Sequence, residues 1–286
     1  MTVARICSDL IALDTSNYGD GSGPGEASAA EYVEAFLSGC GLEPERFSTT
    51  SATRQAVACR IPGQDPQAEA LVIHLHLDVV PAIQSDWSVP AFEGAIHDGM
   101  VYGRGAVDMK DMDAMVLTVV QQWQRDGLKP RRDIVLLFVP DEEAGGRHGA
   151  HWVVDNRPDL LHGVTQGIGE VGGFSFQLDE ERRLYMIETA QKGLAWLRLK
   201  ATGTAGHGSL LSQDNAITRL SRTIARIGAH KFPVQLTPAV EQLLEAVCDA
   251  AGVPFDASDP ESALEQLGPL SRMIGATLRH TANPTM

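Results

Sequence analysis

The sequence predicts an α/β fold in which helices cover both faces of a mostly parallel sheet. Nearly continuous apolar runs at residues 70–77 and 133–139 are typical of strands that are buried on both faces. Apolar residues recur at helical spacing in residues 2–13, 27–39 and 109–123. Strands that alternate with helices in this way indicate a layered α/β domain.

A second, smaller α+β domain is predicted where the pattern changes near residue 191. Two strands and two helices are expected in this part of the chain, at residues 184–189, 194–201, 214–230 and 237–251. We therefore expect one domain over residues 1–190 and a smaller domain over residues 191–286.

The segment between the first two helices is predicted to be a mobile loop. Residues 17–25 contain four glycines and a proline, a composition that favours turns over regular structure. Gly39 and Gly41 are expected to end the second helix, because glycine readily adopts the left-handed backbone conformation found there.

Composition excludes several classes of function. The 286 residues include 37 acidic residues against 23 Lys and Arg, a net charge of −14, which would repel nucleic acids and anionic membranes. The chain contains no apolar stretch of ~20 residues and no apolar leader near Met1, so neither a membrane span nor a secretory signal is expected. Scattered cysteines without a CxxC pair favour a reducing compartment, which predicts a cytoplasmic location. They are Cys7, Cys40, Cys59 and Cys248.

Three acidic segments follow or adjoin the apolar runs and predict a metal site. They are residues 74–78 (HLHLD), 103–111 (GRGAVDMKD) and 141–143 (DEE). Polar groups at the carboxyl ends of neighbouring strands meet at one edge of an open sheet. One imidazole with several carboxylates is a typical ligand set for a divalent metal, most simply zinc. A remaining carboxylate can carry a proton, so the pattern indicates a metal-dependent hydrolase.

Each motif also has a purely structural interpretation. A lone HxD is usually structural, a DEE triplet is usually a solvated turn, and residues 103–105 could form a plain hairpin turn. Residues 103–105 (GRG) are not a phosphate loop, because no GK[ST] follows. By strand parity His74 could join the site, although a hydrogen-bonded structural role is favoured. Asp111 and Asp113 are expected in the first helical turn, where they favour the helix dipole. His148 and His151 are expected on a helix surface.

Together, four motifs in register resemble the M20 family of metallopeptidases over almost the whole chain. The motifs are residues 76–81 (HLDVVP), 103–110 (GRGAVDMK), 141–143 (DEE) and 206–209 (GHGS). That family includes glutamate carboxypeptidases, aminoacylases, succinyl-diaminopimelate desuccinylases, and di- and tripeptidases. The resemblance implies hydrolysis of an amide bond in a small peptide or an N-acyl amino acid.

The resemblance also implies a ligand set for two Zn²⁺ ions in each complete active site, although Co²⁺ or Mn²⁺ could serve with the same residues. His76, Asp108, Glu143 and Glu170 match the family's metal ligands, and Asp108 matches the carboxylate that bridges the two ions. In the family, the peptide bond after that aspartate is often cis, and we expect the same here.

Three further residues match catalytic positions of the family. Asp78 matches the carboxylate that fixes the tautomer of the histidine ligand, and Glu142 matches the general base that activates water. His207 matches a histidine that, in dimeric members, reaches the partner's active site and stabilises an oxyanion. Its alternative is a simple turn residue. The resemblance thus implies that residues 1–190 are a metal-binding catalytic domain. It also implies a homodimer formed through the smaller domain, which acts as a lid and dimerisation domain.

One departure from the family pattern leaves a second hypothesis open. Family members usually continue after the smaller domain and supply a last histidine ligand, whereas this chain ends at Met286. We therefore expect an incomplete smaller domain, a missing ligand and a fragment of a longer hydrolase. The alternative is a non-catalytic descendant that retains the fold for metal binding or assembly. The intact His76, Asp108 and Glu142 weigh against that alternative.

Overall fold

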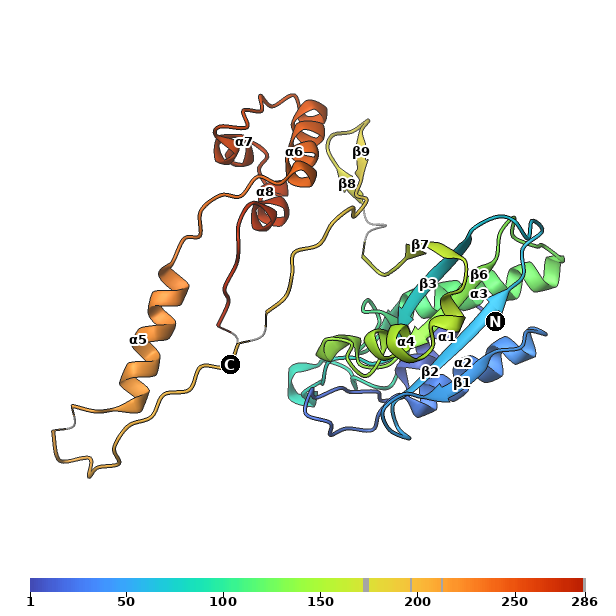
Figure 1. Cartoon of the computed structure of the whole chain (residues 1–286), viewed down its shortest axis with the longest axis horizontal. Helices are drawn as coiled ribbons and strands as arrows, with labels where there is room; N and C mark the ends of the chain where they lie inside the picture. Colours follow the sequence, from blue (N-terminus) through green and yellow to red (C-terminus); the bar gives the residue numbers. More distant parts are fainter. Residues whose placement is uncertain (172–174, 196, 212, 285–286) are drawn as a thin grey trace. The chain divides into compact units, whose positions relative to one another are not determined.

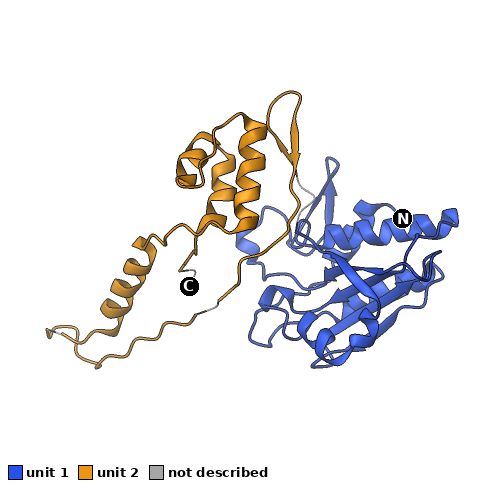
Figure 2. Ribbon diagram, turned by 45° about the horizontal axis from the view of Figure 1, so that its top comes forward, with its two compact units in different colours: residues 1–172 blue, residues 173–286 orange. Residues whose placement is uncertain are grey.

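The computed structural model describes residues 1–171, 175–195, 197–211 and 213–284. It divides into two compact units, Met1–Gly172 and Gly173–Met286, coloured separately in Figure 2. The predicted boundary between residues 190 and 191 stays a prediction. Trp196, which belongs to the predicted strand at residues 194–201, lies outside the described residues. No helix in the described ranges is both long enough and apolar enough to cross a membrane.

Unit 1 contains a five-stranded sheet, a short hairpin and several helices (Figure 1). Its strands are β1 (Glu45–Ser48), β2 (Gln55–Ile61), β3 (Ala70–His76), β4 (Ala95–His97), β5 (Met100–Tyr102), β6 (Ile134–Val139) and β7 (Val164–Ile168). Its α-helices are α1 (Val3–Ile11), α2 (Ala27–Gly39), α3 (Lys110–Asp126) and α4 (Ala150–Asn156). Short 3-10 helices are η1 (Gln84–Asp86), η2 (Glu142–Ala144) and η3 (Pro158–Leu161). The helices and strands predicted for residues 1–139 are therefore confirmed.

The main sheet is mostly parallel, as the sequence predicts. Its strand order is β1-β2-β6-β3-β7, with parallel pairing of β3 to both β6 and β7. Strand β2 pairs antiparallel with both β1 and β6, so it runs opposite to the other four strands. All six residues of β6 are buried, which explains its continuous apolar sequence.

Helices cover both faces of this sheet. The larger core packs the apolar sides of α1, α2 and α3 against one face, and includes Leu10, Val33, Leu75 and Leu117. A smaller cluster lies on the opposite face of the sheet, where Leu137 and Val139 of β6 pack against α4 and η3. Helices on both faces of the sheet confirm the predicted fold class. The packed sheet also holds the ends of its strands in fixed positions.

The carboxyl ends of three parallel strands lie at the same edge of the sheet. The register pairs His76, the last residue of β3, with Val139, the last residue of β6. Strand β7 ends at Ile168, which pairs with Ile73 of β3, and the chain continues from there along the same direction to Glu170. Polar residues that follow β3, β6 and β7 are thereby brought together, although they are far apart in the sequence.

Unit 2 has its own core, formed by helices α6 to α8 and a hairpin. Its elements are β8 (Ser175–Gln177), β9 (Arg183–Tyr185), α5 (Ala216–Ala229), α6 (Pro238–Ala251), α7 (Pro260–Gln266), α8 (Leu270–Ile274) and η4 (Gly275–Leu278). Leu244, Val247 and Leu264 are buried at the centre of this core. Both predicted helices are present as α5 and α6.

The strand predictions in unit 2 were largely wrong. Only Leu184 and Tyr185 of the predicted 184–189 strand belong to β9, and the described residues of 194–201 form no strand. A segment of alternating polarity forms a strand only when a neighbouring strand pairs with its backbone N–H and C=O groups. The described residues of 194–201 have no such neighbour.

The loop between α1 and α2 was also only partly predicted. Asn17 is buried and hydrogen-bonded at its start, and Glu26 is buried at its end, whereas Asp20 to Ser22 are exposed. The mobile-loop prediction is therefore wrong for its first residue, because that side chain has buried partners elsewhere in the unit. Gly41 has a positive φ of 81° just after α2, as expected for a helix end.

Candidate metal centre

His76 is held at the end of β3 with one ring nitrogen directed at two carboxylates. Its side chain is buried, and its backbone N–H donates to the sulfur of Met109 at 3.1 Å. Nδ1 lies 2.9 Å from the backbone carbonyl of Asp78, which accepts its hydrogen bond in that tautomer. Nε2 lies 3.2 Å from Oδ1 of Asp108 and 3.0 Å from Oε2 of Glu170. The ring therefore has a fixed orientation, with Nε2 toward the carboxylates.

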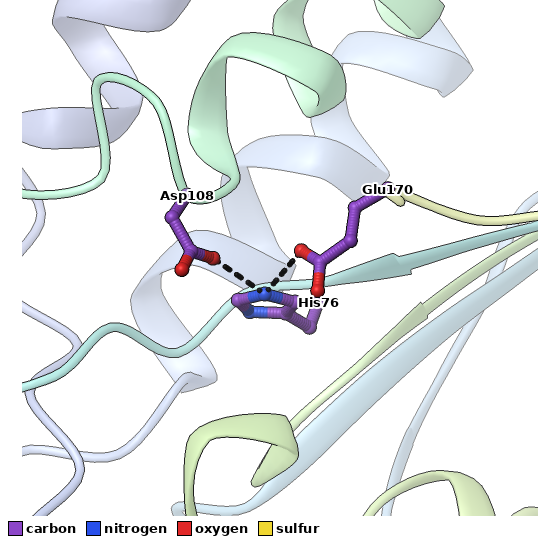
Figure 3. A group of neighbouring side chains, drawn as sticks. All are labelled: His76, Asp108 and Glu170. Carbon is purple, nitrogen blue, oxygen red and sulfur yellow. Dashed lines mark hydrogen bonds and ion pairs between the residues drawn. The ribbon is translucent and has the colours of Figure 1, made fainter. Parts of the chain in front are cut away.

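These three side chains form a donor set that fits a divalent metal (Figure 3). One ligand atom from each of His76, Asp108 and Glu170 lies within 4.8 Å of the other two. Ligand atoms at ~2.0–2.1 Å from a tetrahedral zinc ion are separated by roughly 3.3 Å. This is close to the 3.2 and 3.0 Å that separate Nε2 of His76 from the oxygens of Asp108 and Glu170. One nitrogen and two carboxylate oxygens also match the preferences of such ions.

The charges around His76 compensate one another. Burial opposes its charged form, but hydrogen bonds to the carboxylates of Asp108, Asp78 and Glu170 outweigh burial and raise the pKa of the imidazole. The same hydrogen bond from His76 is the main cause that lowers the pKa of Asp108. A bound dication would take over this positive charge and leave the imidazole neutral.

Asp78 lies on the Nδ1 side of the His76 ring, away from the carboxylates that face Nε2, and its role in catalysis stays a prediction. Its carboxylate is fully buried and lies 3.5 Å from Nδ1 of His76, farther than the carbonyl of the same residue. It accepts the backbone N–H groups of Glu142 at 3.0 Å and Glu143 at 3.1 Å. The backbone carbonyl and the carboxylate of Asp78 both favour the tautomer of His76 that carries its proton on Nδ1. The carboxylate also holds the turn after β6 through its hydrogen bonds with the backbone.

Glu142 and Glu143 follow β6 in the 3-10 turn η2. Oε2 of Glu142 lies 3.8 Å from Nε2 of His76, and its side chain is 41% exposed, so it can meet both solvent and the imidazole. Glu143 accepts the backbone N–H of Val80 at 3.2 Å and is not part of the three-residue donor group. Burial raises the pKa of both carboxyls, with Asp108 the next cause for Glu143, whose pKa is raised to about 7.

The segment before α3 brings Asp108 to this edge. The peptide bond between Asp108 and Met109 is cis, which confirms the expectation from the resemblance. Gly103 has φ 149°, and a Cβ there would lie 2.4 Å from the side chain of Ile11. A Cβ on Gly105 would lie 2.9 Å from the side chain of Lys110. The close packing explains both glycines, and supports a structural role for residues 103–105.

Two histidines singled out in the sequence lie outside this group. His207 belongs to unit 2, where its Nδ1 lies 2.8 Å from the Ser209 hydroxyl and its side chain is exposed. Its catalytic role stays a prediction. His74 is mostly buried, burial lowers its pKa, and its Nε2 has no hydrogen-bond partner among the described residues. The favoured hydrogen-bonded role of His74 is therefore not seen at that nitrogen.

Several buried polar residues near the site have contacts that the sequence did not predict. Lys110 is fully buried and donates through Nζ to the carbonyls of Leu10 at 2.9 Å and Leu13 at 2.7 Å. It therefore ties the start of α3, next to Asp108, to the end of α1. Asn17 and Arg54 bond to the carboxylates behind the site. Lys110 belongs to a motif quoted from the sequence, but its burial did not follow from that motif, and Asn17 and Arg54 carried no pattern.

Comparison with known proteins identifies the family. A family model described as peptidase family M20/M25/M40 matches residues 72–266, which include His76, Asp108, Glu142, Glu143 and Glu170. The chain belongs to the M20 family. Aminoacylase-1 of Sus scrofa is 34% identical over 171 residues, which cover 59% of this chain and 40% of the relative. The N-fatty-acyl-amino acid synthase/hydrolase PM20D1 of Bos taurus is 30% identical over 192 residues, covering 64% of this chain and 38% of the relative.

Solved structures agree with the M20 fold. Human carnosine dipeptidase 1 has a TM-score of 0.62 and 14% identity, with coverage of 97% of this chain and 62% of that one. The M20 metallo-carboxypeptidase Sso-CP2 of Sulfolobus solfataricus has a TM-score of 0.59 and 15% identity, with coverage of 99% and 67%. At these identities the likeness shows the fold alone. The chain spans less than half the length of the curated relatives that it matches.

Proposed function

We propose that this M20 chain carries the metal-binding part of a hydrolase that cleaves the amide bond of an N-acyl amino acid or a small peptide. The observation that carries the proposal is the convergence of His76, Asp108 and Glu170 at the carboxyl edge of the sheet. These groups come from three separate segments and direct one nitrogen and two oxygens at a common point. The nearby Glu142 provides the additional carboxylate that hydrolysis requires.

The residues that would hold the metal are His76, Asp108 and Glu170 for one ion, with Glu143 as a ligand of a second ion and Asp108 shared between them. Two Zn²⁺ ions are our first assignment, and Co²⁺ or Mn²⁺ would also suit this ligand set. When bound, such ions acidify water and polarise the scissile carbonyl group. Asp78 would keep the His76 ring in place through its backbone carbonyl and its buried carboxylate.

Glu142 is the group that we propose as general base. Its carboxylate is partly exposed and its pKa is raised, chiefly by burial, so its proton affinity is greater than that of an ordinary surface glutamate. Glu142 would take a proton from water and then deliver it to the leaving amine. His207 is proposed to stabilise the oxyanion, in a homodimer formed through residues 191–286. A cytoplasmic location likewise remains a prediction from the sequence.

The substrate assignment is supported by the activities for which the relatives are named. Aminoacylases and an N-fatty-acyl-amino acid hydrolase share 30–34% identity with this chain. A carnosine dipeptidase and a carboxypeptidase share its fold. N-acyl amino acids are therefore the first substrates to test, followed by dipeptides. The alternative is a non-catalytic protein that retains the fold and the metal site.

The decisive experiment combines metal stoichiometry with turnover. Wild type, Glu142→Gln and the exposed control Glu31→Gln would be loaded with Zn²⁺ and supplied with N-acyl amino acids and dipeptides. We expect Glu142→Gln to retain the metal and to lose ~10²–10⁴-fold in kcat, since it removes only the proton carrier. Chelation should abolish wild-type turnover, and the control should match wild type. Because this chain spans 40% of the length of aminoacylase-1, metal binding without turnover would favour the non-catalytic alternative only when it is measured in the whole protein.

A further inference from the structure

A buried polar network lies directly behind the turn that carries Glu142 and Glu143. It consists of Asn17, Glu26, Arg54, Asp78 and Asp141. Their exposed fractions are 5%, 0%, 8%, 0% and 2%, so water cannot readily replace lost partners within it. The three carboxylates of the network need fixed donors close by, and each of them accepts at least one hydrogen bond from Asn17 or Arg54.

Asn17 connects two strand ends with one amide group. Its Nδ2 donates to Oδ2 of Asp78 at 2.8 Å and to Oδ1 of Asp141 at 3.2 Å. Asp78 follows β3 and Asp141 follows β6, the two parallel neighbours at the centre of the sheet. The amide therefore acts as a bridge that sets the separation of the two loops.

Arg54 fixes the orientation of that amide. Its guanidinium donates to Oδ1 of Asn17 at 3.0 Å, and the backbone N–H of Gly19 donates to the same oxygen at 3.0 Å. Both groups are donors, so the carbonyl oxygen of the amide must face them and the NH₂ group must face the carboxylates. The other arm of the Arg54 fork pairs with the buried Glu26, which holds the guanidinium in place.

The carboxylates of Asp78 and Asp141 connect the Asn17 amide to the backbone of the turn that carries Glu142 and Glu143. Asp78 accepts the backbone N–H groups of Glu142 and Glu143 at 3.0 and 3.1 Å. Asp141 has a left-handed φ of 71°, and its second oxygen accepts the N–H of His148 at 2.9 Å. The start of the turn is thus bound to the network on both sides, and its backbone determines where the Glu142 and Glu143 side chains begin.

We propose that Asn17 and Arg54 are positioning residues, which act through Asp78 and Asp141 to hold Glu142 and Glu143 in register with His76. The proposal rests on the proposed function for its catalytic consequence, but its structural consequence can be measured without metal or substrate. Neither residue contacts the metal donors, and neither belongs to the sequence motifs of the site.

The test compares Asn17→Leu and Arg54→Lys with wild type and with Ser8→Ala. Ser8 is a matched control, because it is buried in α1 and donates its own long-range hydrogen bond to the carbonyl of Gly94 at 2.6 Å. Lysine retains the charge of Arg54 but cannot reproduce its two-armed contact, so this variant tests the network with a smaller disturbance. Three quantities would be measured: amide hydrogen exchange in residues 141–146, Co²⁺ affinity, and kcat and KM.

We expect exchange in residues 141–146 to accelerate by at least ~10-fold in both network variants and to be unchanged in Ser8→Ala. Co²⁺ affinity and kcat should each fall by ~10–100-fold, as for other residues that orient ligands, with KM within about twofold of wild type. Unchanged exchange in the network variants, or equal acceleration in Ser8→Ala, would overturn the proposal. So would faster exchange with unaltered Co²⁺ affinity and kcat.

A wild type that neither binds Co²⁺ nor turns over substrate would refute the proposed function instead. In that case the exchange comparison alone decides the inference. Selective acceleration in the two network variants would still support the proposal that Asn17 and Arg54 hold the turn in place. Absence of that acceleration would overturn the proposal.

Discussion

Replacing Asp78 with asparagine should destabilise unit 1, although the two side chains have nearly the same shape. Three donors converge on the Asp78 carboxylate: the N–H of Glu142 on one oxygen, and the N–H of Glu143 and the amide of Asn17 on the other. Asparagine has a single acceptor oxygen and adds two donors of its own. At least one of the three donors must then face another donor inside the protein.

The magnitude follows from the better of the two amide orientations. With the new NH₂ group facing Glu142, one buried N–H loses its acceptor, which costs about 1–3 kcal/mol. The two bonds that remain lose their charged acceptor, at about 1 kcal/mol each. Weaker repulsion with Asp141 acts in the opposite direction. We therefore expect Asp78→Asn to lower the free energy of unfolding by about 2–4 kcal/mol at neutral pH.

The effect should also depend on pH. Burial raises the pKa of Asp78, but hydrogen bonds from His76, Asn17 and the turn outweigh it, so its pKa lies below the ordinary value. A depressed carboxyl pKa contributes stability at neutral pH that is lost as the pH falls through the folded-state pKa. The difference between wild type and Asp78→Asn should therefore shrink in acid.

Urea unfolding of the metal-free protein measures this difference, followed by tryptophan fluorescence because Trp87, Trp123 and Trp152 lie in unit 1. Asp133→Asn is the matched control: that carboxylate accepts from Gly63 and Arg60, but its side chain is 31% exposed. It should cost less than about 1 kcal/mol. An Asp78→Asn variant within about 1 kcal/mol of wild type at neutral pH would refute the reasoning.

Two further substitutions test other buried charges of unit 1. Lys110→Met should lower the free energy of unfolding by about 2 kcal/mol, because the carbonyls of Leu10 and Leu13 lose a buried donor; a urea midpoint equal to that of wild type would contradict this. Burial raises the pKa of Glu26 to about 7, partly offset by Arg54, so the folded state retains a proton that the unfolded chain releases. Stability from this group is therefore lost as the pH rises toward 7, and between about pH 5 and 8 wild type should lose up to about 3 kcal/mol relative to Glu26→Gln. Parallel stability curves for these two proteins would disprove the assignment.

Local patterns were sufficient for the elements of unit 1 that lie in its core. The apolar runs of β3 and β6 and the amphipathic spacing of α1, α2 and α3 all reflect burial, which leaves a periodic record in the sequence. Strand β7 left no such record, because Thr165 to Ile168 are exposed. Conversely, the described residues of 194–201 alternate in polarity but form no strand, because alternation alone does not supply a neighbouring strand to pair with.

The sequence by itself determined the fold class, the family resemblance and the residue types of a metal centre, because these depend on burial periodicity and motif spacing. Only the tertiary structure decided that Glu170 lies 3.0 Å from His76, across 94 positions of sequence. It alone placed Asn17 and Arg54 behind the turn that carries Glu142 and Glu143. A buried hydrogen bond joins two specific side chains that folding brings together, and neither residue carries a local pattern that identifies its partner.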